Sequence, residues 1–309
     1  MRILSIGEIL WDVFGEREFL GGAPLNFSVS AQRLGNSVAL LSAVGADSRG
    51  SLAHEAMREH GLMTDFVQAS PTAPTGAAIV STDMQGNASF VIDRPAAFDE
   101  VDLNTSLLSW ISAFQPQWIY FGTLAQAFHG GEQRLAQILN TLPKSKRFYD
   151  INLRHGHWTL PLVKQLSGLA TIIKMNESEA QELWHQTNGH VAYSLDDFCG
   201  FWAAAYGCEL ICITRGSAGC AVWQPDHLQF FPGFRVSVVD TVGAGDAFAA
   251  AFLHGLEQEW PVERTANFAN RIGGFVASRA GATPDWSLEE FPDFARAVSV
   301  VTPNPGPSE

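Results

Sequence analysis

The sequence predicts an α/β fold with a mostly parallel central sheet, helices on both of its faces and a small additional β-sheet. Short runs rich in β-branched and aromatic residues alternate with longer helical patterns along most of the chain, which is typical of strand–helix–strand units with parallel strands. Residues 10–22 and 75–94 break this alternation and have the pattern of β-hairpins. We therefore expect a single α/β domain over residues 1–309, with the hairpins as a small β appendage.

The predicted elements follow one another in a regular order. The strand "RILSIGE" precedes the helix "APLNFSVSAQRLG", and the strand "VALLSAVG" precedes the helix "SLAHEAMREHG". After the second hairpin, which is expected to turn at residues 84–87, the pattern resumes with the strands "WIYFG", "RFYDIN", "LATIIKMN" and "LICITRG". Ligands bind at the carboxyl ends of the strands in such sheets. Residues 302–309 have the composition of a flexible tail.

The composition excludes several classes of partner. The chain has 309 residues, of which 46% are hydrophobic, and a formal net charge of -13. Nucleic acids and anionic membranes bind clustered Lys and Arg, so we expect the chain to bind neither. No apolar run approaches the length of a membrane span, and the first residues lack the pattern of a secretion signal. We expect a cytoplasmic protein with buried, reduced thiols at Cys199, Cys208, Cys212 and Cys220.

The stretch "DTVGAGDAF" is the most informative motif of the chain. A strand that ends near Asp240 and a helix that begins near Gly245 would leave backbone N–H groups unpaired at the helix N-terminus. These groups belong to Gly243, Ala244 and Gly245, and together with the helix dipole they form an anion hole. The motif is neither a Walker A loop nor a dinucleotide fingerprint, because G-K-[ST] and the third glycine are missing.

Asp246 follows this anion hole directly. A carboxylate at this point would repel a resting phosphate, but it would suit a hydroxyl group lying between the two. Asp246 would accept the proton of that hydroxyl while the N–H groups stabilise the transferred phosphoryl group. The motif therefore favours a kinase. The alternative is structural: the glycines form a tight turn, and Asp246 caps the helix.

Two distant motifs, in this order, resemble the signatures of the ribokinase or PfkB family of carbohydrate kinases. "GGAPLNFSVSAQRLG" with "VGADSRG" resembles the N-terminal signature, and "DTVGAGDAFAAAF" resembles the C-terminal one. Further matches are "DINLRHGHW", "NESE", "TRGSAG", "FANRIGG" and "RAGATP", so the resemblance covers nearly the whole chain. It implies a ribokinase-like fold and transfer of the γ-phosphoryl group of ATP to a sugar hydroxyl.

The resemblance implies a catalytic base and a set of sugar-binding residues. Asp246 is implied as the base that activates the sugar hydroxyl, beside the anion hole of residues 243–245. Carboxylate and amide groups can pair with vicinal hydroxyls, which suits the residues that resemble the family's sugar-binding set: Asp12, Gly21, Gly22 and Asn26. In "DINLRHGHW", Asn152 and Arg154 alternate as if at the end of a strand and are further candidate substrate-binding residues, with Arg154 suited to a phosphoryl oxygen or a substrate group. The alternatives are a helix cap for Asn26, a turn at Gly21–Gly22 and an internal salt bridge for Arg154.

The resemblance also implies a nucleotide site and two cation sites. The nucleotide-binding residues are expected to be Asn176, Thr214, Gly216, Gly219 and Asn270. Glu179 completes an N-x-x-E element and is implied to hold Mg²⁺ through water, which suits an ion that keeps much of its water shell. A helix-start cap is the alternative for this element. A site for a monovalent cation such as K⁺, with mainly backbone ligands, is implied at Asp240, Val242 and Gly281.

The two hairpins acquire a role from the same resemblance. In this family such a β appendage is a lid over the sugar, and a lid that excludes water suppresses wasteful hydrolysis of ATP. The appendage is also a candidate contact for a homodimer. Phe90 and Arg94 on the second hairpin are candidates to face the sugar. A packed Phe and a solvated Arg are the alternatives.

The expected sugar is fructose. "GGAPLN" and "DINLRHGHW" resemble fructokinases more than ribokinases or adenosine kinases, although Leu25 and "RAGATP" depart from the fructokinase pattern. The alternatives are another sugar of this family, such as ribose or 2-keto-3-deoxygluconate, a noncatalytic sugar sensor on the same fold, and a nucleotide-dependent dehydrogenase. The intact Asp246 disfavours the sensor, and the missing third glycine disfavours the dehydrogenase.

Overall fold

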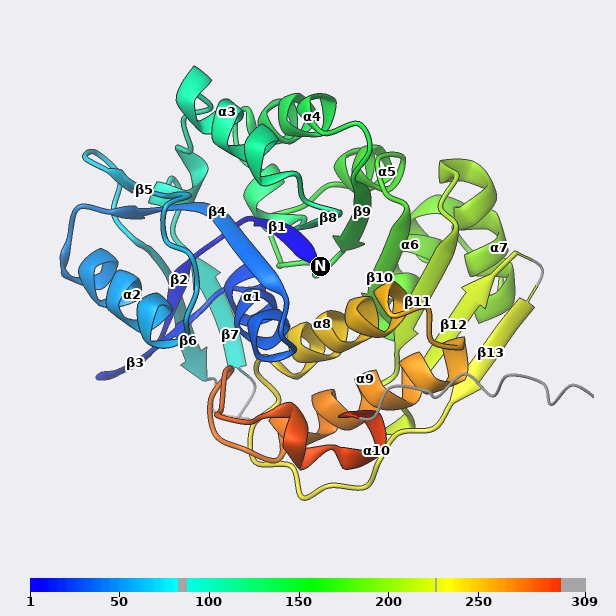
Figure 1. Ribbon diagram of the computed structural model, residues 1–309. Helices are drawn as coiled ribbons and strands as arrows, with labels where there is room; N and C mark the ends of the chain where they lie inside the picture. The colour runs from blue at the N-terminus through cyan, green and yellow to red at the C-terminus, as the bar shows by residue number, and fades with distance from the viewer. Residues whose placement is uncertain (83–87, 226, 296–309) are drawn as a thin grey trace, which may run out of the picture.

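The computed structural model describes residues 1–82, 88–225 and 227–295. Within these residues the main sheet has nine strands (Figure 1). Their order across the sheet is β13 (His227–Phe231), β12 (Cys220–Gln224), β11 (Leu210–Thr214), β10 (Ile172–Asn176), β9 (Lys146–Asp150), β8 (Trp118–Gly122), β1 (Arg2–Ile6), β4 (Ser37–Gly45) and β5 (Val67–Ser70). Neighbouring strands from β11 through β5 are parallel, whereas β12 and β13 add an antiparallel edge. The predicted α/β class with a mostly parallel sheet is confirmed.

Helices cover both faces of this sheet, as the alternation predicted. Side chains of successive strand residues point to opposite faces, so Ile3 and Leu4 of β1 belong to two different hydrophobic clusters. Ile3 packs in the cluster that contains residues of α1 (Ala23–Arg33), α2 (Ser48–Glu59), α8 (Ala244–Glu257) and α9 (Val262–Ala277). Leu4 packs in the cluster that contains residues of α3 (Thr105–Phe114), α4 (Gly131–Thr141), α5 (Leu160–Ser167), α6 (Glu177–Asn188) and α7 (Leu195–Tyr206).

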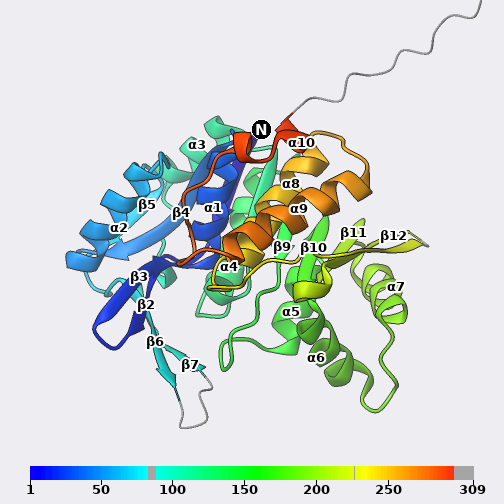
Figure 2. The same ribbon diagram turned by 90° about the horizontal axis from the view of Figure 1, so that it is seen from below.

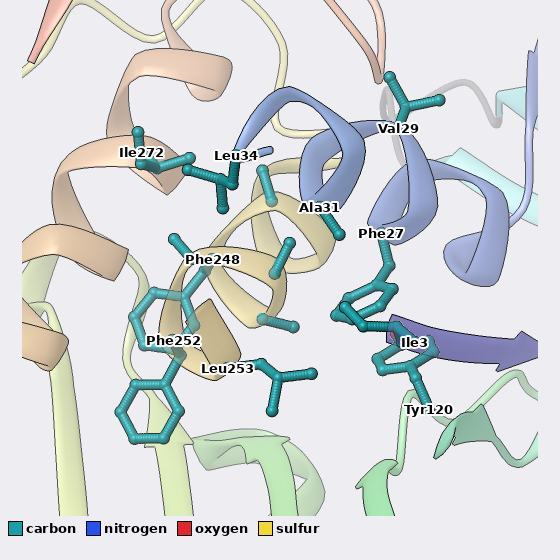
Figure 3. Packing of buried hydrophobic residues seen from close by; sticks show 14 of the residues in the cluster. Ile3, Phe27, Val29, Ala31, Leu34, Tyr120, Phe248, Phe252, Leu253 and Ile272 are labelled. Carbon is teal, nitrogen blue, oxygen red and sulfur yellow. The ribbon is translucent and has the colours of Figure 1, made fainter. Parts of the chain in front are cut away.

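Helix α8 lies at the centre of the first cluster, between α1 and α9 (Figure 3). Its residues Ala247 and Ala249–Ala251 are fully buried, and their small side chains let the neighbouring helices approach closely. Phe27 of α1 stacks on Tyr120 of β8 with ring centroids 3.7 Å apart. Burying a side chain such as Phe27 contributes about 1.5–3 kcal/mol. This packing fixes the N-terminus of α8 at the carboxyl ends of the strands.

The two expected hairpins pair into one small sheet. Its strands lie in the order β3 (Arg17–Gly21), β2 (Leu10–Phe14), β6 (Gly76–Thr82) and β7 (Ala88–Ile92). Each hairpin is antiparallel, and the parallel pairing of β2 with β6 joins the two. Figure 2 shows this sheet projecting from the body of the molecule beside the main sheet. The expected turn at residues 84–87 lies outside the described residues.

Other expectations concern the whole chain. All four cysteines are buried and free, as expected. In the described part of the chain, none of the helices combines the length and the apolar character that a membrane span requires. A short helix, α10 (Pro292–Ala295), ends the described part. The expected tail at residues 302–309 lies outside it.

Candidate active site

A cavity of about 880 Å³ lies where the parallel strands end. Residues at the carboxyl ends of three neighbouring strands line it, namely Asp150 of β9, Asn176 of β10 and Thr214 of β11. Leu10 and Asp12 of the small sheet also line it. The cavity thus joins the expected sugar-binding residues to the expected nucleotide loop. This is the position that the parallel sheet predicted for a ligand.

The N-terminus of α8, where the anion hole is expected, lines the cavity. Gly243 is the N-cap with φ 76°, and a Cβ atom there would lie 2.2 Å from the backbone oxygen of Ala282, so only glycine fits. Among the described residues, the N–H groups of Gly243 and Gly245 have no backbone partner, but the N–H of Ala244 donates to the oxygen of Thr241 at 3.3 Å. The expectation of three unpaired groups is therefore wrong for Ala244, because the chain makes a tight turn before the helix.

Asp246 is buried in the first turn of α8 and faces the cavity wall formed by α1. Its Oδ2 accepts a hydrogen bond from Nδ2 of Asn26 at 2.9 Å. No side chain caps α8, so the interpretation of Asp246 as a helix cap is wrong. Burial raises the pKa of Asp246 to about 6, against the opposing attraction of Lys174. A carboxylate with this pKa is ionised at neutral pH and is a better proton acceptor than an ordinary Asp.

Asn26 lies inside α1, whose N-cap is Gly22. The interpretation of Asn26 as a helix cap is therefore wrong. Its amide nitrogen binds Asp246, and its Oδ1 is buried without a partner among the described residues. Asn26 thus connects the N-terminal motif to the C-terminal one.

Lys174 and Asp150 form a buried ion pair, and Lys174 also attracts Asp246. This pair was not predicted from the sequence. Nζ of Lys174 donates to both carboxylate oxygens of Asp150, at 3.0 and 2.9 Å, and the hydroxyl of Tyr120 donates to Asp150 at 3.1 Å. Burial alone would lower the pKa of Lys174, but attraction by Asp150 and Asp246 outweighs it and raises that pKa. A Cβ atom at Gly245 would lie 3.4 Å from Nζ, so the ammonium group adjoins the expected anion hole. The available signal was a lysine within the apolar strand "LATIIKMN".

Most of the expected sugar-binding residues meet at one end of the cavity. Asp12, Gly22, Asn152 and Arg154 line it together with Asn26 and Asp246. Burial raises the pKa of Asp12 to about 6, against the attraction of Arg154. Gly21 lies behind Asp12, since a Cβ atom there would be 2.8 Å from its Oδ2. Arg154 is exposed and forms no salt bridge within the described residues, so the interpretation of an internal salt bridge is wrong.

Arg94 does not face the cavity. Its side chain is only 6% exposed and forms an ion pair with the fully buried Asp99, and its Nη1 donates to the oxygen of Leu124 at 3.2 Å. The guanidinium also lies over the rings of Phe98 and Phe128. A buried carboxylate requires such a partner, so both a sugar-facing and a solvated Arg94 are wrong. The side chain of Phe90 lies outside the described residues.

All five expected nucleotide residues line the same cavity. A Cβ atom at Gly219 would lie 2.1 Å from the oxygen of Phe231, so the chain passes too closely for any other residue. Asn270 of α9 donates to the oxygens of Phe231 and Pro232 at 3.3 and 3.2 Å and holds the next loop in place. Thr214 and Gly216 complete this wall.

Asn176 and Glu179 form the helix cap that was the alternative for the N-x-x-E element. Asn176 caps α6, and the two side chains bind each other's backbone N–H groups at 2.8 Å. Oε1 of Glu179 also accepts from the N–H of Leu153 at 2.7 Å. Both residues still line the cavity. Each carboxylate oxygen has a second lone pair, so the donor set fits a Mg²⁺ ion held through water.

Asp240 connects two loops beside the anion hole. Its Oδ1 accepts from the N–H of Val242 at 3.0 Å, and its Oδ2 accepts from the N–H of Gly281 at 3.1 Å. The three residues expected around a monovalent cation are thus in contact. Since Asp240 binds N–H groups, its visible role is to fix the loop that leads into Gly243.

A buried carboxylate beside a helix N-terminus with unpaired N–H groups, in a cavity of this size, is an arrangement that suits phosphoryl transfer. The model of the pfkB family carbohydrate kinases matches residues 7–289. The chain belongs to this family and is a carbohydrate kinase, an enzyme that transfers the γ-phosphoryl group of ATP to a sugar hydroxyl.

Individual relatives agree with this family. The fructokinase of Escherichia coli is 27% identical over 276 residues, which cover 85% of this chain and 87% of that protein. The solved structure of a Xylella fastidiosa fructokinase with bound ATP has a TM-score of 0.80 at 21% identity, over 91% of this chain and 94% of that one. The Vibrio cholerae fructokinase bound to fructose, ADP and calcium has a TM-score of 0.77 at 22% identity, over 91% of this chain and 94% of that one. A double mutant of the latter was solved with fructose, ADP and potassium.

Proposed function

We propose that this carbohydrate kinase is a fructokinase that uses ATP and Mg²⁺. The observation that carries the proposal is the buried Asp246, which lines the cavity in the first turn of α8 and is held there by Asn26. The similarity to the Escherichia coli fructokinase supports fructose as the sugar. The resemblance of "GGAPLN" and "DINLRHGHW" to fructokinase sequences supports the same choice.

In this proposal the chain's own residues move the proton and hold the charge. The sugar lies among Asp12, Gly22 and Asn26, and Asp246 accepts the proton of its attacking hydroxyl. The N–H groups of Gly243 and Gly245 bind the oxygens of the transferred phosphoryl group, and Arg154 is free to do the same. When bound, Mg²⁺ would neutralise the charge of the ATP phosphates, with Glu179 holding it through water.

Further roles remain proposals on the same basis. The nucleotide phosphates are placed along Thr214, Gly216 and Gly219, with Asn176 and Asn270 nearby, and K⁺ beside Asp240, Val242 and Gly281. The small sheet is proposed to close over the sugar as a lid. Its exposed apolar side chains, Phe19, Ile79 and Val91, support a homodimer contact through the lid.

An ATP-consumption screen tests the proposal. The panel comprises fructose, ribose, 2-keto-3-deoxygluconate, tagatose 6-phosphate and nucleosides, and we expect fructose to have the highest kcat/KM. A higher value for any other member would contradict the fructose assignment while leaving the kinase class intact.

The pH dependence of turnover provides a second prediction. A carboxylate base acts only when ionised, so activity is complete above its pKa and falls as the pH falls through it. Because burial raises the pKa of Asp246 to about 6, kcat at saturating sugar should decline below about pH 6 rather than near pH 4. Asp12 also has a pKa of about 6, so the Asp12→Asn variant is the control and should keep the same inflection in kcat. A profile that stays flat down to pH 4.5 would contradict the assignment of the base.

A further inference from the structure

Two buried oxygen atoms at the sugar end of the cavity have no hydrogen-bond partner among the described residues. They are Oε2 of Glu8 and Oδ1 of Asn26. Both residues are 4% exposed, and both line the cavity. A buried acceptor without a donor is costly and rare in native proteins. Two of them in the wall of one cavity indicate that a ligand supplies the donors.

The carboxylate of Glu8 is held rigidly in this wall. The backbone N–H groups of Glu8 and Ala23 interact with it, which places it at the N-terminus of α1. Gly22 presses on the same residue, since a Cβ atom there would lie 2.5 Å from the backbone oxygen of Glu8. One carboxylate oxygen therefore remains for a ligand, in a fixed position.

The charge around Glu8 favours a neutral ligand. Asp12 and Asp246 line the same end of the cavity as Glu8. Arg154 attracts the carboxylate of Glu8, and Asp246 repels it. Lys174 is paired with Asp150. Arg235 also lines the cavity, but it follows Gly233, which lies against Gly219 of the expected nucleotide loop. Arg154 is therefore the cation left near Glu8, and its single charge faces three carboxylates. Hydroxyl groups can donate to these carboxylates, whereas a carboxylate or phosphate substituent would be repelled by them.

We propose that Glu8 is a substrate-binding residue which, with Asn26, accepts hydrogen bonds from two sugar hydroxyls and selects neutral sugars against sugar acids and sugar phosphates. This inference deepens the proposed function and rests on it for the location of the sugar. It does not depend on fructose being the particular sugar.

A structural role for Glu8 makes a different prediction. Gly22, the N-cap of α1, has no side chain to cap the helix. The carboxylate of Glu8 instead accepts from the backbone N–H of Ala23, the first residue of α1. A role confined to the helix would affect stability without affecting sugar selection. Asp47 provides the matched control, because it caps α2, accepts from the N–H of Gly50 at 2.8 Å and lies outside the cavity.

The test combines enzyme and substrate changes. Glu8→Gln, Asp47→Asn and wild type are assayed with fructose and with analogues that each lack one hydroxyl donor: the deoxyfluoro fructoses, and 2,5-anhydro-D-mannitol, which lacks the anomeric hydroxyl. For one position other than the phosphorylated one, wild-type kcat/KM should fall about ten- to a hundredfold, as expected for a charged hydrogen bond. With fructose, kcat/KM of Glu8→Gln should be lower than that of wild type by about the same factor. With that analogue, the substitution should lower kcat/KM little further. Asp47→Asn should behave like wild type.

Selection by charge is measured with the same proteins. Glu8→Gln should raise kcat/KM for 2-keto-3-deoxygluconate relative to fructose by about tenfold, and Asp47→Asn should leave the ratio unchanged. The proposal is overturned if the loss from Glu8→Gln and the loss from hydroxyl replacement are additive at every hydroxyl position. It is also overturned if Glu8→Gln does not change the ratio of kcat/KM for 2-keto-3-deoxygluconate to that for fructose.

Two further outcomes are also decisive. If Glu8→Gln does not fold, the same cycle is run with Glu8→Asp, which withdraws the carboxylate by one methylene group and should lose the same hydroxyl contact. If another neutral sugar is the best substrate, only the fructose assignment fails, and the same cycle is run on that sugar. A sugar acid or sugar phosphate as the best substrate overturns the proposal.

Discussion

Asp246→Asn is expected to lose at least about a hundredfold in kcat and to remain folded. Asn preserves the shape of the side chain but cannot accept a proton from the sugar hydroxyl, and a positioned general base contributes about 10²–10⁴ in rate. A hundredfold loss corresponds to about 2.7 kcal/mol of activation free energy. Burial disfavours the charged form of Asp246 and so raises its pKa. Because the substitution removes this buried charge, the folded protein should not be destabilised.

Steady-state kinetics and thermal denaturation check this prediction together. The variant should melt near the wild-type temperature and bind fructose and ATP with modestly changed affinity, so that the loss lies in kcat. Turnover within a few-fold of wild type in a folded variant would show that Asp246 is not the base. Asp246→Glu is the second probe, because it retains the carboxylate and displaces it by one methylene group.

Lys174→Met is expected to lower the free energy of unfolding by about 3–5 kcal/mol. The substitution removes the ammonium group and leaves Asp150, whose side chain is 1% exposed, as an uncompensated buried carboxylate. The same change removes an attraction that lowers the pKa of Asp246. The inflection in the pH profile of kcat should therefore shift upward.

Urea denaturation of three variants measures the first effect. The double variant Asp150→Asn/Lys174→Met should recover most of the lost stability, because no buried charge remains unpaired. The control is the exposed pair of Arg49 and Glu18, where Arg49→Met should barely change the stability. Equal losses for the single and the double variant would show that the ion pair itself, rather than its imbalance, determines the stability.

The parts of the site that the sequence predicted are those encoded locally. The turn into α8 requires glycine at Gly243 and places Asp246 in the first helical turn, and both requirements lie within nine consecutive residues. Likewise, the alternation of strands and helices predicted the sheet and its two covered faces, because each element has its own period. Such features need no knowledge of distant neighbours.

The parts that the sequence did not predict depend on contacts between distant segments. Lys174 and Asp150 belong to different strands, and only the parallel pairing of β9 with β10 brings them together. Arg94 resembles a sugar ligand by its place on the second hairpin, yet Asp99 holds it inside the protein. Nor could the sequence show that the oxygen of Glu8 lacks a donor, since that depends on every group around it.

The hydrogen bond between Asn26 and Asp246 joins residues separated by 220 positions in the chain. A ribosome that adds about 5–20 residues per second needs roughly 10–45 s to synthesise the segment between them. During that interval the nascent polypeptide already contains the residues of its first strands that we propose to contact the sugar, but it lacks the proposed proton acceptor and anion hole. On the proposed mechanism, the emerging chain can neither phosphorylate sugar nor hydrolyse ATP until translation is nearly finished, and the appearance of catalytic activity would report that synthesis has passed α8.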